Sequence, residues 1–390
     1  EAFLLNRLKE LLKTPLIWCF ALFILGYTAW DLLTPDKEKS DMENRYLQQK
    51  PTLTLKNLFA KGDNAYNQRY EKYINDQFVL RDDWITLKSR AETALGKIEN
   101  NGIAYGKDGY LFEKVVSVDE ENLQKNIQYV QEFLQMYPQQ KTTLCIIPNA
   151  YTVLTDKLPA GFENITVNQR DWINRIYQSQ WPSNLSTLDI TDALAEHSDE
   201  YIYYRTDHHW TTYGAYFAYR QYIESLDMTP VSWETIQSVK GGTVEDFYGT
   251  FYSKAKNADV QPDSITWYDI PCTVEINGEA VDSLHNVEQF SQRDKYAGLM
   301  RSNNALTVLY SQVNQNHQEG KTSRVLVVKD SYGNLMIPYL CYHFDEVYAI
   351  DLRYLATMSS VMGETDFDEL LILYNFANFA DDTNIPKLRY

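Results

Sequence analysis

Short apolar segments of strand type alternate with helical segments through most of this chain. The strand-type segments are continuous apolar runs, as in strands buried on both faces, and they lie at residues 142–148, 325–328, 346–350 and 370–373. The helical segments have apolar residues spaced for one face, and they lie at residues 119–137, 169–180, 212–226 and 332–342. This alternation predicts an α/β fold with a central parallel sheet between helix layers, and functional residues at the carboxyl ends of its strands.

The N-terminal region contains an apolar stretch at residues 15–33 whose only charged residue is Asp31. Its length suits a helix that crosses the hydrocarbon core of a membrane. Arg7, Lys9 and Lys13 precede it, so the positive-inside rule predicts a cytoplasmic N-terminus and an extracellular remainder. A cleaved signal peptide is one alternative, disfavoured because no small-x-small cleavage site follows the stretch, and a buried helix of a soluble protein is the other.

The length of 390 residues is enough for one large domain or two smaller ones, and we expect one domain beyond this single-pass cell-membrane anchor. We expect a cytoplasmic stub and anchor at residues 1–33, a polar linker at 34–61 and the α/β domain at 62–390, with a polar insertion at 263–320. A β-hairpin is expected at residues 102–112. Apolar residues with helical spacing are expected to face a core at Tyr66, Tyr70, Tyr73, Phe78, Trp84, Leu87 and Leu95.

Charge and residue usage argue against nucleic-acid binding and against a metal or cofactor site. The formal net charge of −17 argues against nucleic acid as a partner, because phosphate binding needs a basic surface. The 30 tyrosines and 8 tryptophans serve either core packing or a groove that stacks on sugar rings. The four cysteines have no metal-type spacing, although Cys272 and Cys341 could pair. No metal ion or other cofactor is therefore expected.

An Asp lies two residues before a His in the segment Thr-Asp-His-His-Trp-Thr, which begins at Thr206. In an extended segment Asp207 and His209 share a face, so the carboxylate can orient the imidazole of a catalytic base. His208 is then expected to point the other way. The alternatives are a metal site, for which no third ligand has a suitable spacing, and a structural pair of histidines.

A serine follows the apolar run at 325–328 where the next helix is expected to begin. At this junction Ser331 is exposed near the positive end of the helix, and the backbone N–H of Tyr332 is expected to donate to an oxyanion. An N-cap serine is the alternative. Asp207, His209 and Ser331 together supply the parts of a Ser-His-Asp hydrolase or acyltransferase.

Three further residues are candidates for substrate binding. Asn149 follows the strand-type run at 142–148, and its side-chain amide could donate to an oxyanion. Gly249 could offer its backbone N–H to the same oxyanion, and Arg353 could reach a substrate carboxylate or hydroxyl. The alternatives are two ordinary turn residues and, for Arg353, a salt bridge with Asp351 or another acid.

The segment that begins at Thr206 resembles the signature of the bacterial DHHW protein family. The wider pattern is similar to the SGNH-hydrolase-like domain of the alginate O-acetyltransferases, over roughly residues 60–380. Their Asp-x-His-Trp-Thr-x-x-Gly-Ala pattern is matched by Asp207, His209, Trp210, Thr211, Gly214 and Ala215. Their later serine at a strand end is matched by Ser331, and residues 106–112 and 147–151 resemble family features too.

The resemblance implies an SGNH-hydrolase-like fold that transfers acetyl groups to cell-surface polysaccharide or exopolysaccharide through Ser331. It also implies work outside the membrane, beside a membrane-bound O-acyltransferase that carries the acyl group across. We expect the chain to depart from the family in having a membrane anchor and no C-terminal carbohydrate-binding module. The alternatives are a carbohydrate acetylesterase with the same three residues and a non-catalytic scaffold of a polysaccharide synthesis complex.

Overall fold

The chain divides into a smaller N-terminal unit that ends at Leu95 and a larger unit, Gly96–Tyr390. The structure, a computed structural model, describes residues 14–257, 259–363 and 365–390. The domain boundaries expected from the sequence remain a prediction.

The smaller unit begins with the apolar helix α2, Pro15–Leu33, at the bounds that the sequence predicts. Its proline occupies the first turn, where a missing N–H costs no hydrogen bond. The helix is long and apolar enough to cross a membrane and is not buried, although a signal sequence meets the same criteria. Arg7, Lys9 and Lys13, on which the expected orientation depends, lie outside the described residues.

The rest of the smaller unit contains a short hairpin and three helices, at β1 (Lys39–Ser40), β2 (Arg45–Tyr46), α3 (Leu55–Leu58), α4 (Tyr66–Gln77) and α5 (Arg81–Ala94). The expectation that the apolar residues of this segment face a core is wrong for most of them. Trp84, Leu87 and Leu95 are 44%, 57% and 88% exposed, and Tyr70 and Phe78 are exposed too. Helical spacing predicts an apolar face, but it does not tell what covers that face.

The larger unit is built on an eight-stranded sheet with the order β11-β10-β12-β14-β13-β15-β6-β7. The strands are β6 (Thr142–Ile147), β7 (Leu185–Leu188), β10 (Cys272–Ile276), β11 (Glu279–Val281), β12 (Leu306–Ser311), β13 (Arg324–Lys329), β14 (Glu346–Ile350) and β15 (Glu369–Asn375). The five strands from β14 to β7 are parallel, which confirms the predicted fold class. The other three, from the expected insertion, extend the sheet with antiparallel pairing.

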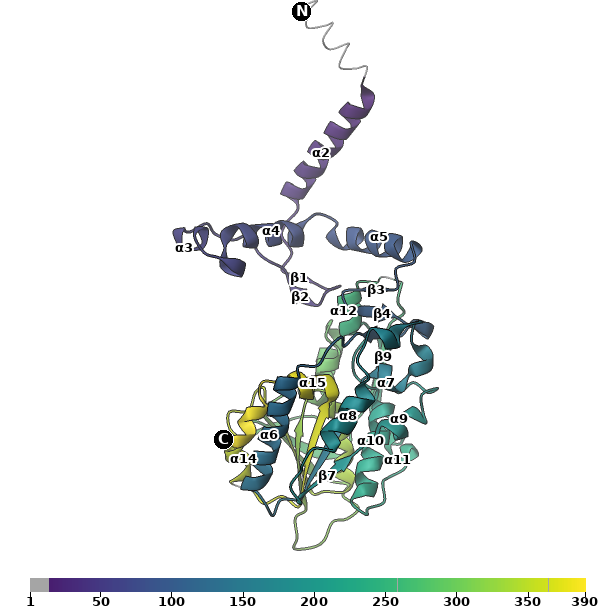
Figure 1. The fold of residues 1–390 in the computed structure, drawn as a ribbon, viewed down its shortest axis with the longest axis vertical. Helices are drawn as coiled ribbons and strands as arrows, with labels where there is room; N and C mark the ends of the chain where they lie inside the picture. Colours follow the sequence, from purple (N-terminus) through teal and green to yellow (C-terminus); the bar gives the residue numbers. More distant parts are fainter. Residues whose placement is uncertain (1–13, 258, 364) are drawn as a thin grey trace, which may run out of the picture. The chain divides into compact units, whose positions relative to one another are not determined.

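Side chains of β13 alternate between the two faces of this sheet and pack against different helices. Val325 and Val327 belong to a core with α10 (Thr212–Ser225), and Leu326 and Val328 to a core with α6 (Glu120–Met136). Helices therefore cover both faces, giving the three expected layers (Figure 1). Burying each of these aliphatic side chains stabilises the fold by about 1.5–3 kcal/mol.

The cysteines are free thiols in this structure. Cys272 lies on β10, and the buried Cys341 lies in the helical segment Ile337–Tyr342. The neighbouring Cys272 thiol and burial raise the pKa of Cys341. The two thiols are thus close together, but no disulfide joins them.

A buried histidine of the larger unit should make the fold less stable in acid. His285 Nδ1 accepts a hydrogen bond from the Met300 N–H at 3.0 Å, and burial lowers the pKa of His285 from 6.5 to about 4. Between these values the unfolded state binds the proton and the folded state does not. The free energy of unfolding should therefore fall as the pH decreases from 6.5 to 4, by up to about 1.4 kcal/mol per pH unit for this residue.

Urea unfolding of wild type and His285→Gln at pH 7 and pH 5 tests this expectation. The variant should lose less stability than wild type between the two pH values, because glutamine does not titrate. An equal loss in both proteins would contradict the account of His285.

Candidate active site

Ser331 lies in the turn between β13 and the short helix α13, Gly333–Met336. The carboxylate of Asp330 fixes this turn. Its Oδ1 accepts from the Tyr332 N–H at 2.9 Å, and its Oδ2 accepts from the Asn375 N–H at 2.8 Å and from Asn378 Nδ2 at 2.7 Å. The serine is thereby tied to the carboxyl end of the neighbouring strand β15. This edge is where an α/β sheet places its functional residues.

His209 joins Ser331 to Asp207 through two hydrogen bonds. Its Nε2 lies 2.8 Å from Ser331 Oγ, and its Nδ1 lies 2.6 Å from Asp207 Oδ1. Burial opposes ionisation of Asp207, but His208, His209 and the backbone of Thr250 hold the pKa of Asp207 well below its usual range. An ionised carboxylate only accepts, so His209 Nδ1 carries the proton and Nε2 accepts from the Ser331 hydroxyl.

Thr250 completes the surroundings of the carboxylate. Its N–H donates to Asp207 Oδ2 at 2.7 Å and its Oγ1 lies 3.1 Å from the same oxygen. Both carboxylate oxygens therefore have partners, which fixes the plane of the carboxylate and with it the imidazole. Sequence reasoning missed Thr250, because it is far from Asp207 along the chain.

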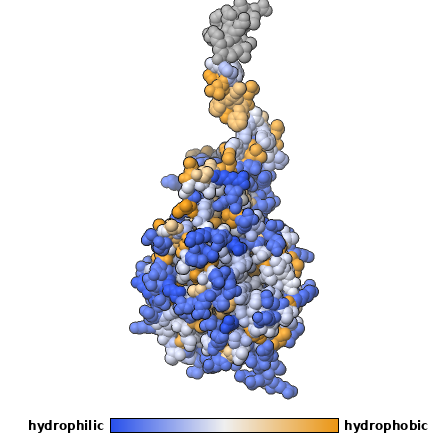
Figure 2. Space-filling view, turned by 90° about the vertical axis from the view of Figure 1, so that its right-hand side faces the viewer, coloured by the Kyte–Doolittle hydropathy of each residue, from blue (hydrophilic) through white to orange (hydrophobic). Residues whose placement is uncertain are grey.

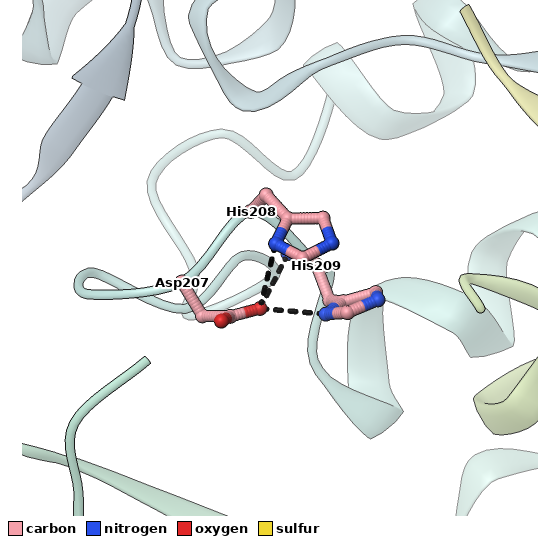
Figure 3. Close-up of side chains that lie close together, drawn as sticks. All are labelled: Asp207, His208 and His209. Atoms are coloured by element: carbon pink, nitrogen blue, oxygen red, sulfur yellow. Dashed lines mark hydrogen bonds and ion pairs between the residues drawn. The ribbon is translucent and has the colours of Figure 1, made fainter. Parts of the chain in front are cut away.

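The prediction that His208 points away from His209 is wrong. The two rings lie 3.8 Å apart between centroids, and His208 Nδ1 is 3.4 Å from Asp207 Oδ1 and 2.7 Å from Thr250 Oγ1 (Figure 3). Residues 205–209 form a run of bends, so the period-two alternation of a strand does not apply. Burial and the adjacent His209 lower the pKa of His208 to about 4, so it is neutral at pH 7.

Asp207, His208 and His209 are also a group that could hold a metal ion, with ligand atoms within 4.8 Å of one another (Figure 3). Nitrogen and carboxylate ligands would suit a zinc ion. A cation between them would compete with the hydrogen bond that joins His209 to Asp207 and with the one that joins His208 to Thr250. The expectation of no metal remains a prediction.

Two aromatic residues hold the histidine and the serine turn together. Tyr296 stacks on the His209 ring, with centroids 3.7 Å apart and planes at 8°, and its hydroxyl donates to Ser331 O at 2.9 Å. Trp210 donates from Nε1 to Tyr332 O at 2.9 Å. Tyr296 belongs to the expected insertion, and nothing in its polar sequence context distinguishes it as a site residue.

The expected oxyanion donors differ in whether their N–H groups already donate a hydrogen bond in the structure. The Tyr332 N–H, predicted as a donor, is occupied by Asp330 Oδ1. The N–H of Ser331 makes no hydrogen bond within the described part of the chain. Asn149 lies at the end of β6 and accepts through Oδ1 from Gln169 and Asn375, both at 2.9 Å. Its Nδ2 has no partner among the described residues, so its donor role remains a prediction.

Gly249 was predicted to donate its backbone N–H to an oxyanion, but this N–H already has an acceptor in the structure. Its N–H donates to Thr206 Oγ1 at 3.0 Å, so it is not available to an oxyanion. A side chain at this position would instead overlap Asp207, because an added Cβ would lie 2.7 Å from Asp207 Cα and closer still to the carboxylate. The glycine lets the start of helix α12, Thr250–Ala255, approach Asp207.

The Gly249→Ala variant should therefore lose catalytic power rather than substrate binding. We expect kcat for ester turnover to fall at least tenfold and the fold to lose about 1–3 kcal/mol, because the new methyl group displaces Asp207 or the start of α12. Steady-state kinetics and urea unfolding measure both effects. Gly26→Ala is the control, since its Cβ meets nothing within 4 Å; wild-type kcat in Gly249→Ala would refute this role.

Arg353 makes the salt bridge that was the alternative to substrate binding. Its Nε and Nη2 lie 2.9 and 2.5 Å from the two oxygens of the buried Asp351. It also lines a pocket of about 190 Å³ with Asp330, Tyr374, Asn378, Asp381 and Asp382. The structure thus places Arg353 beside the Asp330 turn without a hydrogen bond to Ser331, and its role toward substrate remains a prediction.

The fold and the site define an α/β protein with the Ser-His-Asp arrangement of hydrolases and acyltransferases. A family model described as DHHW protein matches residues 104–350, and the chain belongs to this family. The predicted family is therefore confirmed.

Several solved structures are similar to this chain. A DHHW family protein from Eubacterium siraeum matches with 23% identity and a TM-score of 0.61, over 75% of this chain and 96% of that chain. Bacillus cereus PatB1 matches with 16% identity and a TM-score of 0.57, over 72% and 97%, and is also known with a sulfonyl adduct. The O-acetyltransferase domain of Pseudomonas putida AlgJ matches with 15% identity and a TM-score of 0.46, over 74% of this chain and 98% of that chain. Among curated proteins, none matches the chain in sequence.

Proposed function

We propose that this protein is an extracytoplasmic serine-dependent O-acetyltransferase that acts on hydroxyl groups of a cell-surface polysaccharide or exopolysaccharide. The observation that carries the proposal is the continuous chain of hydrogen bonds from Asp207 through His209 to Ser331. A serine hydroxyl is a weak nucleophile until a base takes its proton, and this arrangement supplies the base and orients it.

In the first step Ser331 Oγ attacks the carbonyl carbon of an acyl donor while His209 Nε2 takes the hydroxyl proton. The carbonyl oxygen becomes an oxyanion, for which the free N–H of Ser331 and Asn149 Nδ2 are the proposed donors. Each such donor contributes about 10²–10³ in rate. The intermediate then expels the donor's leaving group, which takes the proton from His209 and leaves an acetyl ester on Ser331.

In the second step His209 Nε2 takes the proton of a sugar hydroxyl, whose oxygen attacks the ester carbonyl. The C–O bond to Ser331 breaks, and the serine oxygen recovers the proton. The anionic Asp207 stabilises the imidazolium in both steps, and the stacked Tyr296 ring holds the His209 ring in its orientation. Transfer exceeds hydrolysis where the site positions a sugar hydroxyl better than water.

The apolar helix α2 supports a proposal for the location of the protein. We propose that this helix anchors the protein, with the N-terminus in the cytoplasm and the larger unit outside, beside a membrane-bound O-acyltransferase that delivers the acyl group. The length and apolar character of α2 support anchoring. The net charge of −17 supports a partner other than nucleic acid.

A carbohydrate acetylesterase would use the same three residues, so the test must separate transfer from hydrolysis. We would measure 4-nitrophenyl acetate turnover by the full chain in detergent, with and without a panel of oligosaccharides, beside Ser331→Ala and His209→Ala. Acetyl found on a sugar by mass spectrometry, and lost in both variants, is the expected result. Hydrolysis that no oligosaccharide affects would favour the esterase, and turnover no higher than in Ser331→Ala would favour a non-catalytic scaffold.

A further inference from the structure

The smaller unit exposes several large apolar side chains outside α2. Ile74 on α4 is 46% exposed, and Tyr70 on α4 and Trp84 and Leu87 on α5 are exposed as well. In Figure 2 hydrophobic residues are concentrated along α2, whereas the visible face of the larger unit is mainly hydrophilic. Contiguous apolar surface of this kind marks a contact with a partner or a membrane.

The side of α4 opposite to Ile74 packs against another segment of the smaller unit. Asp76 is buried and accepts a paired hydrogen bond from Arg45 at 2.9 and 2.6 Å and another from the Gln48 N–H at 2.8 Å. Asp76 lies about 200° around the helix from Ile74, at about 100° per residue. The polar face of α4 thus packs against the β1–β2 hairpin, which leaves the face with Tyr70 and Ile74 uncovered.

The corner between α4 and α5 is fastened to the last turns of α2. The Tyr27 hydroxyl donates to Val79 O at 2.7 Å and accepts from Trp84 Nε1 at 2.8 Å, and Asp31 Oδ1 accepts from the Val79 N–H at 2.8 Å. The Tyr27 ring also lies 5.3 Å from the Phe78 ring. In Figure 1 α4 and α5 lie at this end of α2.

These contacts set the depth of the corner along the apolar helix. Asp31, which accepts from the Val79 N–H, lies about 3 Å before Leu33, at a rise of about 1.5 Å per residue. A bilayer that covers Pro15–Leu33 therefore puts its interfacial region near this corner, and Trp and Tyr side chains favour that region. Charge agrees, because residues 51–95 carry seven Lys and Arg against six Asp and Glu in a chain of net charge −17.

We propose that the apolar face of α4 and α5 lies in the interfacial layer of the same bilayer that α2 crosses. The occupant of this face is lipid, and the two helices form an interfacial platform at the foot of the anchor. The inference uses the anchoring proposed above but not the proposed chemistry. An amphipathic helix pair of this kind would fix the anchor in depth and rotation.

The test uses the full chain in vesicles of phosphatidylcholine and phosphatidylglycerol. Cys19→Ser and Cys272→Ser remove the accessible thiols, and a fluorescent label is attached at Ile74→Cys, at Lys72→Cys or at Phe23→Cys. Lys72 is the matched control, because it is exposed on the same helix and lies one turn before Asp76 on its polar face. Phe23 is exposed in the middle of α2 and reports on the anchor.

Lipids with a nitroxide high on the acyl chain should quench the label at residue 74 at least twofold more than the label at residue 72, and aqueous iodide should show the reverse order. A label at residue 23 quenched by nitroxide, with equal iodide access at 72 and 74, would overturn the platform and leave the anchor. Protection of residue 74 from both quenchers would assign the face to a second copy of the chain. No nitroxide quenching at 23 or 74 would refute anchor and platform together.

Discussion

Replacement of Ser331 by alanine should reduce kcat/KM for ester turnover by at least about 10³-fold, because the nucleophile is removed while the oxyanion donors remain. The fold should not change, since Ser331 Oγ bonds only to His209 among the described residues. Steady-state kinetics with 4-nitrophenyl acetate, together with the thermal midpoint, measure both expectations. Loss of activity with an unchanged midpoint would assign the effect to chemistry.

Ser291→Ala is the control for this prediction. Ser291 lies in the same unit, and its exposed hydroxyl donates to Glu288 O at 2.7 Å, so its removal should leave turnover at the wild-type rate. Turnover by Ser331→Ala within tenfold of wild type would mean that Ser331 is not the nucleophile.

The Asp207→Asn variant should lower kcat by about 10⁴-fold. The amide keeps the shape of the carboxylate, but its NH₂ group next to His209 Nδ1 favours the tautomer with the proton on Nε2. His209 then cannot take the proton of Ser331, and no anion stabilises an imidazolium. The measurement is kcat against KM, and most of the loss should be in kcat because the acyl donor does not contact Asp207 in this account.

The chain offers a matched pair for this variant. His317 Nδ1 lies 2.7 Å from Asp345 Oδ1, an Asp–His contact like that of the site. Asp345 also accepts from the Ser323 N–H at 2.8 Å, and its interactions hold its pKa at about 2 despite burial. Asp345→Asn should therefore reduce stability but leave kcat within about threefold, so a similar kcat loss in both variants would indicate a general effect of removing a carboxylate.

The sequence predicts much of the fold, because its signals are local. Continuous apolar runs give β6, β13, β14 and β15, and their alternation with helices gives the parallel order. The antiparallel strands β10, β11 and β12 add to the same sheet, which the largely polar segment that contains them does not indicate. The exposed face of α4 and α5 also escapes sequence reasoning, because helical spacing says nothing of what lies beyond the helix.

The residues of the site likewise differ in whether a local sequence signal predicts them. Asp207, His209 and Ser331 could be chosen from spacing and from a strand-to-helix junction, and the fold brings all three together. Thr250 and Tyr296 could not be chosen, because tertiary packing alone carries them to the imidazole and carboxylate. The place of His208 was mistaken because the segment is a series of bends, and the role of Gly249 because its N–H already has a partner.

In the proposed mechanism His209 activates Ser331 to take an acyl group. Brief reaction with an activated acetyl ester, an acid quench and peptide mass spectrometry test it most directly. We expect an acetyl group on the peptide that contains Ser331 in wild type, absent in His209→Ala and released when a sugar acceptor is added before the quench. An acetyl group elsewhere in the chain, or the same acetylation of Ser331 in His209→Ala, would contradict it.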